Sequence, residues 1–304
     1  MTDIARLSIV LSAYNEEEFI EAAVQSILRP FETSEAALHF DLEVVVIDDH
    51  STDRTVEILE ALNEPRLRIL RNPTKGKVQA YNFGLQQSTG QFVILFAGDD
   101  LFNVSGIMPR LEPIRDVVGP AATFCALQAF RDHPDNPAQR FPKKGGGARA
   151  GGAIAMNRAF VDRFMPIPVE LPNEDSWMCL HADYLDTYTV DIDVVGMWYR
   201  LHDANTSGYG LGDAEARRAA LLARSKVYIR FLLEREGQMT DGDRRRLSLE
   251  IAAHAMAATG NTLSILFLSH YPVFRRVRAA FLSRNFLWKV RVWLGEWVSG
   301  LVRA

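Results

Sequence analysis

The chain has 304 residues, of which 48% are hydrophobic and 24% are charged, and its formal net charge is −4 at pH 7. This composition is typical of a globular protein with a large core, and the weakly negative charge gives no reason to expect a nucleic-acid partner. Only two cysteines occur, Cys125 and Cys179, which excludes a disulfide framework and a four-cysteine zinc site and favours a reducing, cytoplasmic environment. The first residues lack the pattern of a cleavable signal peptide, and no apolar run reaches the roughly 18 residues that predict a transmembrane helix.

The first hundred residues alternate between strand and helix patterns. Short apolar runs at Leu7–Ala13, Leu42–Ile47, Leu67–Leu70 and Phe92–Ala97 predict strands. Apolar residues at helical spacing lie between them, and we expect the first of these helices to end before Pro30. The alternation predicts an α/β fold with a largely parallel sheet and helices on both faces.

Polar residues follow each of the four predicted strands: Tyr14–Asn15, Asp48–Asp49, Arg71–Asn72 and Asp99–Asp100. Ligands of open α/β sheets bind beyond the carboxyl ends of the strands. Loops are polar in any protein, but this alternative explains the two aspartate pairs less well, because adjacent carboxylates repel each other unless a cation is near. The first turn has no glycine-rich phosphate motif, so we predict that a divalent metal at Asp99 and Asp100 neutralises the diphosphate of a nucleotide.

Several motifs in the same order resemble the large inverting glycosyltransferase family 2, whose catalytic domain has the Rossmann-like GT-A fold. The resemblance covers residues 6–208. It rests on Ser8–Glu16, Val44–Thr55, Lys75–Lys77 with Ala80, Asn82 and Gly84, Gly90–Phe92, Asp99–Asp100 and Asn173–Asp175. It implies a metal-dependent inverting enzyme that moves a sugar from a nucleotide-sugar, expected to be UDP-linked, to a glycan or a lipid-linked glycan.

The resemblance also implies roles for individual residues. The donor would be bound by Ala13, Tyr14, Glu16, Asp48, Arg71, Lys77 and Asp99. The metal, Mn²⁺ or Mg²⁺, would be held by Asp99, Asp100 and His202. Ala97 stands where the family's common Asp-x-Asp-Asp motif has its first aspartate, which leaves open how Asp99 and Asp100 divide the binding of metal and ribose. A histidine in a loop can also be merely solvated, which is the alternative for His202.

Asp175, with Glu174 beside it, resembles the catalytic base of the family. An acceptor hydroxyl is a poor nucleophile until a carboxylate takes its proton during attack. The alternative is that both acids simply occupy the first turn of a helix, where they interact favourably with the helix dipole. The two interpretations are compatible.

The rest of the chain divides into a middle segment and a helical tail. Residues 131–153 are rich in proline and glycine, and they predict either an acceptor-side loop that orders over the donor phosphates or a plain flexible loop. We expect residues 1–212 to form the nucleotide-sugar-binding and catalytic domain. Residues 213–304 are expected to be a helical C-terminal region.

Residues 271–304 form a basic, aromatic segment with seven basic residues and one acidic residue, a net charge of +6. Phe281, Phe286, Trp288, Trp293 and Trp297 are interleaved with these charges. The pattern predicts peripheral contact with an anionic membrane, here the cytoplasmic face of the inner membrane. The alternative is an amphipathic helix that packs on its own domain and leaves its arginines in water.

Two other functions remain open at this point. The first is a polyprenyl-phosphate glycosyltransferase of the same fold, which an acceptor screen with polyprenyl phosphate would separate from the glycan enzyme. The second is a non-catalytic scaffold that binds a glycan or a nucleotide. Asp99, Asp100 and Asp175 argue against the scaffold, because a binding protein does not need them.

Overall fold

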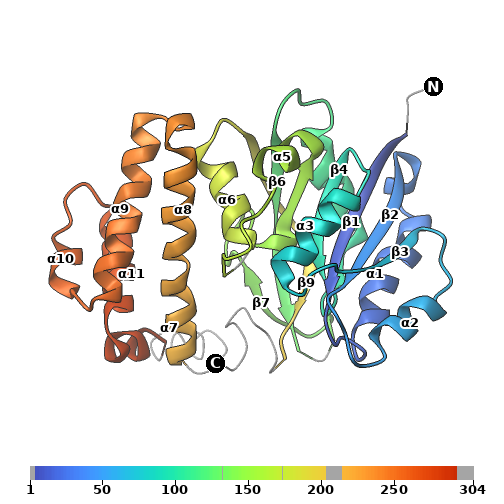
Figure 1. Ribbon diagram of the computed structural model, residues 1–304, viewed down its shortest axis with the longest axis horizontal. Helices are drawn as coiled ribbons and strands as arrows, with labels where there is room; N and C mark the ends of the chain where they lie inside the picture. The colour runs from blue at the N-terminus through green and yellow to red at the C-terminus, as the bar shows by residue number, and fades with distance from the viewer. Residues whose placement is uncertain (1–3, 132, 173, 203–213, 293–304) are drawn as a thin grey trace. The chain divides into compact units, whose positions relative to one another are not determined.

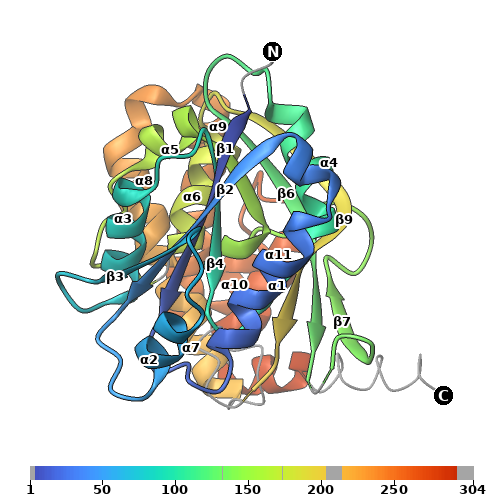
Figure 2. The same ribbon diagram turned by 90° about the vertical axis from the view of Figure 1, so that its right-hand side faces the viewer.

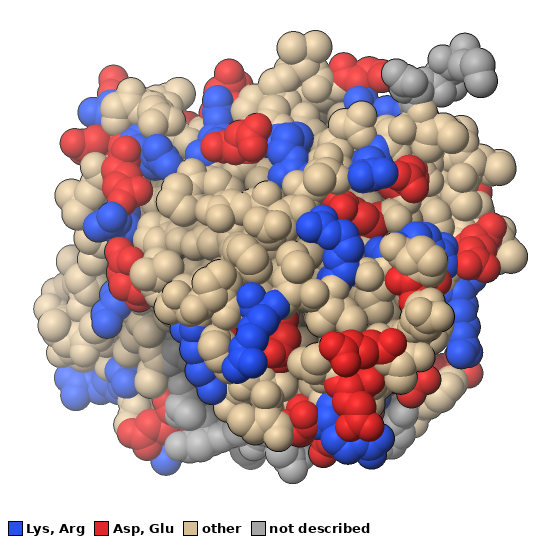
Figure 3. Space-filling view, turned by 45° about the vertical axis from the view of Figure 1, so that its right-hand side comes forward, with Lys and Arg blue, Asp and Glu red and all other residues tan. Residues whose placement is uncertain are grey.

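The computed structural model describes residues 4–131, 133–172, 174–202 and 214–292, which belong to two compact units, Met1–Leu201 and His202–Ala304 (Figure 1). The predicted boundary after residue 212 lies outside the described residues. Acidic and basic side chains are interspersed in small groups on the face drawn in Figure 3, which fits the small net charge of the chain.

The first unit is built on one nine-stranded sheet in the order β3-β2-β1-β4-β8-β6-β9-β5, with β7 paired to β6. The strands are β1 (Ala5–Ala13), β2 (Phe40–Asp48), β3 (Leu67–Arg71), β4 (Phe92–Ala97), β5 (Leu101–Phe102), β6 (Ala121–Phe130), β7 (Pro137–Phe141), β8 (Ile154–Asn157) and β9 (Tyr188–Arg200). The first four strands are parallel to one another, β8 is antiparallel to β4 and β6, and β6 is parallel to β9. The predicted α/β sheet is confirmed, parallel over its first four strands and mixed beyond β4.

Helices cover both faces of this sheet (Figure 2). They are α1 (Ile20–Glu32), α2 (Thr55–Ala61), α3 (Lys77–Gln87), α4 (Ile107–Leu111), α5 (Arg158–Phe164) and α6 (Glu174–Tyr184), with 3-10 turns η1 (Glu35–Leu38), η2 (Val104–Gly106), η3 (Glu112–Ile114) and η4 (Gly151–Ala153). Alternate side chains of β1 point to opposite faces, so Ile9 joins the core under α1 while Val10 faces α3. A Cβ atom on Gly84 of α3 would lie 2.5 Å from Val10 Cγ1, so only glycine lets this helix approach the sheet so closely.

The expected end of the first helix before Pro30 is wrong, because α1 continues through Pro30 to Glu32. Proline removes only one backbone donor, and this late in a helix it disturbs few hydrogen bonds. Phe31 is 4% exposed and belongs to the core under the sheet. Tertiary packing therefore holds the last turn in place against the local preference.

The middle segment, residues 131–153, contains a strand and several ion pairs. β7 lies within it and pairs with β6. The guanidinium of Arg149 bonds Asp191 at 2.6 Å and Asp183 at 3.2 Å, and Arg140 forms an ion pair with Asp193. Two basic residues of the segment, Arg140 and Arg149, are therefore held by carboxylates of β9 and of α6.

The second unit is helical, as predicted, and consists of α7 (Ala214–Ala223), α8 (Ser225–Arg235), η5 (Glu236–Gln238), α9 (Asp241–Ala258), α10 (Thr262–Leu266) and α11 (Val273–Ser283). Small side chains let α9 and α11 pack closely around a core that includes Ala253, Ala257, Ala280 and Trp288. Trp288 is 6% exposed, so it contributes to this core and does not face solvent. No helix in the described part of the chain is long and apolar enough to cross a membrane.

Candidate active site

The carboxyl ends of four parallel strands meet at one edge of the sheet. The register pairs Ala13 with Asp48 and Asp48 with Arg71, while Ser12 pairs with Ala97. The sequence therefore brings its predicted donor-binding residues to one edge because parallel strands end together.

Both aspartates at the end of β2, Asp48 within it and Asp49 after it, accept hydrogen bonds from nearby loops. Asp49 Oδ1 accepts from Asn72 Nδ2 and from the backbone N–H of Gly76, both at 2.7 Å, and Asp48 Oδ1 accepts from the N–H of Ser51 at 3.0 Å. Asp49 thus ties the loop after β2 to the turn that starts α3, and this structural task explains an aspartate next to Asp48 without a metal. Asp48 stays the candidate for contact with the base.

Tyr14 and Arg71 have polar surroundings at the ends of their strands. Tyr14 is 44% exposed, and Lys75 Nζ lies 4.0 Å from the centre of its ring, a cation–π contact. Arg71 Nη2 is 3.3 Å from His50 Nδ1. These groups can flank a flat, polar ligand such as a nucleoside.

Glu16, Asp99 and Asp100 concentrate negative charge beyond β4. Burial and the charge of Asp99 raise the pKa of Asp100, which is 3% exposed. Burial, Asp99 and Asp53 raise the pKa of Glu16 to about 8. A Cβ atom on Gly98 would lie 3.3 Å from Glu16 Cγ, so the glycine lets Glu16 pack against the backbone that leads into the aspartates. Such a cluster is stabilised by a cation.

Arg200, at the end of β9, fixes the aspartate turn. Its backbone N–H donates to Asp100 Oδ1 and its Nε donates to the carbonyl of Asp99, both at 2.9 Å. The guanidinium also lies over the rings of Phe19 and Phe130, at 4.9 and 4.7 Å. No local sequence pattern links Arg200 to Asp99 and Asp100, which lie about a hundred residues earlier in the chain, so this role could not be predicted.

Lys77 joins the donor side of the site to the predicted base. It begins α3, and its Nζ lies 3.0 Å from Oε1 of Glu174, which begins α6. Burial lowers the pKa of Lys77, but the charge and hydrogen bond of Glu174, together with the charges of Tyr81 and Asp175, outweigh this effect and raise the pKa above its usual value. Glu174 is 5% exposed, and its Oε2 is buried without a hydrogen-bond partner in the described part of the chain.

Asp175 lies beside the glycines of η4. A Cβ atom on Gly151 would be 3.8 Å from Asp175 Cβ and 3.7 Å from Glu174 Oε1. Behind η4, Arg110 is completely buried and its Nη2 donates to the carbonyl of Gly152 at 3.1 Å. Because α6 begins at Glu174, both acids also occupy a helix N-terminal turn, as the alternative interpretation predicts.

The described residues supply only some of the ligands that a divalent metal needs. Among the described residues, no three His, Cys, Asp or Glu side chains gather into a metal site. Asp99 and Asp100 supply the oxygen ligands that Mg²⁺ and Mn²⁺ prefer. Burial and the charge of Asp99 raise the pKa of Asp100 even though Lys77 and Arg200 act in the opposite direction. A diphosphate and water would complete such a site. His202 begins the second unit, and its role as a ligand stays a prediction.

Residues 8–156, about half of the chain, match the family described as Glycosyl transferase family 2. The chain carries a glycosyltransferase family 2 domain. The predicted resemblance is confirmed. An uncharacterized glycosyltransferase of Nostoc sp. is 28% identical to the chain over 119 residues, 38% of this chain and 35% of the relative. An undecaprenyl-phosphate 4-deoxy-4-formamido-L-arabinose transferase of Pectobacterium carotovorum is 26% identical over 201 residues, 64% and 60% of the two chains. The alignments thus span about one third to three fifths of the length of these relatives.

Two groups of solved structures share the fold of this glycosyltransferase chain. TarS of S. aureus, residues 1–349 in complex with UDP-GlcNAc, superposes with a TM-score of 0.59 at 15% identity, covering 93% of this chain and 82% of that 1–349 chain. The mannosyltransferase PcManGT of Pyrobaculum calidifontis, in complex with GDP-Man and Mn²⁺, gives 0.61 at 18% identity, covering 96% and 84%. At these identities the likeness establishes the GT-A-like fold.

Proposed function

We propose that this chain is a metal-dependent, inverting glycosyltransferase that moves a sugar from a nucleotide-sugar, with UDP as the nucleotide, to a glycan or lipid-linked glycan. The observation that carries the proposal is the position of Lys77 between two groups of carboxylates. It forms an ion pair with Glu174, the charges of Glu174 and Asp175 both raise its pKa, and its own charge acts on Asp100. Lys77 thus interacts both with the aspartate turn, which is suited to a metal-bound diphosphate, and with Glu174 and Asp175, which are suited to general-base catalysis.

On the donor side, Asp48 accepts a hydrogen bond from the base and Tyr14 lies along the nucleoside. Asp99 and Asp100 hold the metal, which supplies positive charge for the leaving diphosphate when it is bound. Arg200 keeps both aspartates in place through its hydrogen bonds to the turn. Rigid placement of charged groups is the main source of transition-state stabilisation in such sites.

On the acceptor side, Asp175 takes the proton of the acceptor hydroxyl while the oxygen of that hydroxyl attacks the anomeric carbon of the donor sugar. The bond between that carbon and the diphosphate oxygen breaks in the same displacement, so the anomeric configuration inverts. Glu174, held by Lys77, orients the acceptor. Gly151 of η4 has no side chain beside the two acids, which leaves space for a sugar to approach them.

A polyprenyl-phosphate acceptor is the second candidate, and the printed activity of the Pectobacterium relative favours it. In that case a phosphate oxygen, already ionised, attacks the sugar and needs no base. The Asp175→Asn variant separates the two acceptors: transfer to a hydroxyl should fall by about 10²–10⁴-fold, whereas transfer to undecaprenyl phosphate should fall little. Peripheral membrane contact through residues 271–304 suits either lipid-borne acceptor.

The experiment that tests the proposal is calorimetric titration with UDP, GDP and CDP, each in Mn²⁺ or in EDTA. We expect UDP to bind in Mn²⁺, and Asp99→Ala and Asp100→Ala to weaken binding by at least about tenfold, since each loses a charged metal ligand. Asp116→Ala, an exposed aspartate outside the candidate site, is the matched control and should bind normally.

Two results would count against this function. If no nucleotide binds under any condition, the proposed glycosyltransferase function is refuted. Normal donor binding in Asp175→Asn, together with full biological activity, favours the non-catalytic scaffold.

A further inference from the structure

The turn between α10 and α11 exposes large apolar side chains. Leu263 is 69% exposed, Phe267 81%, Val273 69% and Phe274 79%. All four lie within twelve residues of sequence: Leu263 is on α10, Phe267 directly follows that helix, and Val273 and Phe274 begin α11. The two helices pack against each other in one small core. We call these four residues the apolar tip. Side chains of this kind and exposure, gathered in one short segment, mark an interaction surface.

The backbone of the apolar tip is held firmly. Arg276 Nε donates to the carbonyl of Tyr271 at 2.6 Å, and its Nη1 donates to that of Leu266 at 3.3 Å. On the α9 side, Glu250 bonds both the Tyr271 hydroxyl and the Arg275 guanidinium. The exposure of the four apolar side chains is therefore built into the folded unit.

The segment that carries the apolar tip has charges of one sign. Residues 259–292 contain six lysines and arginines and no aspartate or glutamate. Arg278, Arg284 and Lys289 are exposed, and none of them forms an ion pair with a carboxylate within the described ranges. A second copy of this surface would bring positive charge against positive charge, so self-association is disfavoured and an anionic partner is favoured.

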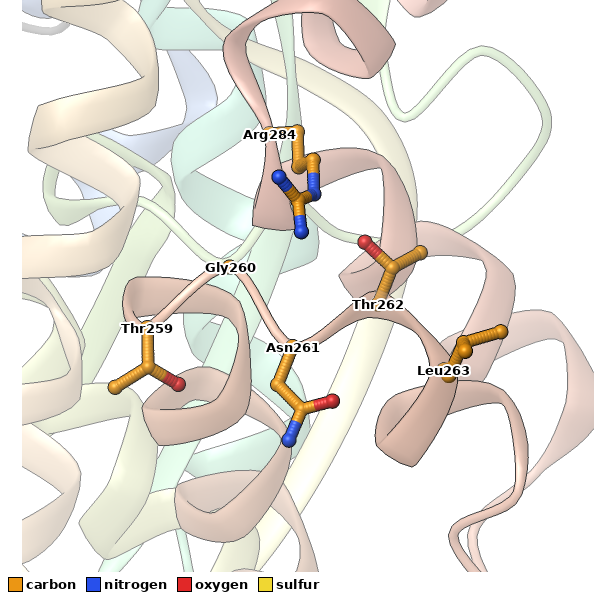
Figure 4. Close-up of a pocket in the computed structure, with 6 residues that line it drawn as sticks. All are labelled: Thr259, Gly260, Asn261, Thr262, Leu263 and Arg284. Atoms are coloured by element: carbon orange, nitrogen blue, oxygen red, sulfur yellow. The ribbon is translucent and has the colours of Figure 1, made fainter.

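A pocket of about 580 Å³ adjoins the apolar tip. It lies where α9 ends and α10 begins, and it is lined by residues 259–263 together with Arg284 (Figure 4). The guanidinium of Arg284 points toward the turn at Gly260, and Leu263 of the apolar tip forms part of the wall. Hydroxyl, amide and guanidinium groups thus stand directly beside an exposed apolar side chain, as a group that binds at the boundary of water and lipid requires.

We propose that the apolar tip docks on the surface of a bilayer that contains anionic phospholipids. Leu263, Phe267, Val273 and Phe274 enter the boundary between headgroups and acyl chains. Arg278 and Lys289 meet lipid phosphates, and the pocket at Arg284 seats one of them. This surface begins before the segment at residues 271–304 that the sequence predicted, and it does not depend on the transfer reaction.

The test is sedimentation of the full chain with vesicles of phosphatidylcholine alone and of phosphatidylcholine mixed with phosphatidylglycerol. We expect the wild type to bind the anionic vesicles and to be released by salt, because exposed charges are screened. The double variant Phe267→Ser/Phe274→Ser should partition at least about tenfold more weakly, and Arg284→Gln about fivefold more weakly. Leu233→Ser is the matched control, since Leu233 is 71% exposed on α8, and it should bind as the wild type does.

The altered side chains are exposed, and thermal unfolding will verify that each variant folds. The proposal is overturned if the wild type ignores both kinds of vesicle, if salt leaves its binding unchanged, or if the double phenylalanine variant binds as strongly as the wild type. A change in oligomeric state of that variant with unchanged vesicle binding would assign the tip to a second copy of the chain. Nucleotide titration is a separate measurement, so failure of docking is distinguishable from failure of the proposed reaction.

Discussion

Glu16→Gln tests whether the site carries excess negative charge before any donor or metal binds. The pKa of Glu16 is raised from 4.5 to about 8 by burial, by Asp99 and by Asp53. The folded protein therefore holds this proton more tightly than the unfolded chain does. The free energy of unfolding should fall as the pH rises through the window from about 4.5 to 8.

The size of the effect follows from the shift. At 1.36 kcal/mol per pKa unit, a shift from 4.5 to about 8 corresponds to an upper limit of roughly 5 kcal/mol. Glu16 is only partly buried, and solvent screening reduces this to roughly 2 kcal/mol. Glutamine keeps the shape and cannot ionise, so Glu16→Gln should be more stable than the wild type by about that amount at pH 8 and equal to it near pH 4.5.

The assay is urea unfolding in EDTA at intervals between pH 4.5 and 8.5, on the wild type, Glu16→Gln and the exposed neighbour Glu18→Gln. Glu18→Gln should follow the wild-type curve. The raised pKa of Glu16 is refuted if the difference in the free energy of unfolding between wild type and Glu16→Gln stays constant over the whole pH range. It is also refuted if the wild type gains stability relative to the variant as the pH rises.

Three further changes address the contacts that support the site. Lys77→Met should cost about 1–3 kcal/mol of stability because it leaves the buried charge of Glu174 unpaired, and adding Glu174→Gln should restore most of it; a double-mutant cycle by urea unfolding measures the coupling. Arg110→Met should leave the free energy of unfolding unchanged or raise it by up to ~3 kcal/mol, since Nε and Nη1 of this buried cation have no hydrogen-bond partner in the described structure. The same substitution should slow sugar transfer, because the Gly152 carbonyl loses its donor. Unaltered turnover would show that Arg110 has no positioning role. Asn82→Ala should cost about 2–4 kcal/mol by leaving two buried backbone groups unpaired, and a smaller loss in thermal unfolding would contradict this estimate.

The parallel half of the sheet could be predicted because its signals are local. An apolar run that ends at a polar pair, as Phe92–Ala97 does before Asp99, shows both the strand and its carboxyl end. The parallel arrangement then places Ala13, Asp48 and Arg71 along one edge without further information. The resemblance added Glu174 and Asp175, and the structure places them next to Lys77.

The contacts between distant segments could not be predicted in this way. Arg200 bonds Asp99 and Asp100 across about a hundred residues, and Arg110 supports Gly152 across about forty. Neither arginine stands in a pattern that distinguishes it from a solvated surface residue. Pro30 shows the converse error, because a strong local signal for a helix end was overridden by the packing of its neighbour.

The candidate site contains carboxylates whose ionisation destabilises the folded protein. Glu16 and Asp100 are held where their ionised forms are disfavoured, and Arg200 fixes the aspartate turn chiefly through hydrogen bonds to its backbone and to one carboxylate oxygen. The positive charge of Lys77 is shared with Glu174 on the acceptor side. In the proposed function, a metal-bound nucleotide would add a further cation beside these carboxylates, and the strain in the donor-free protein would become part of the affinity for the donor. A substitution that relieves the strain should therefore stabilise the fold and weaken the site together.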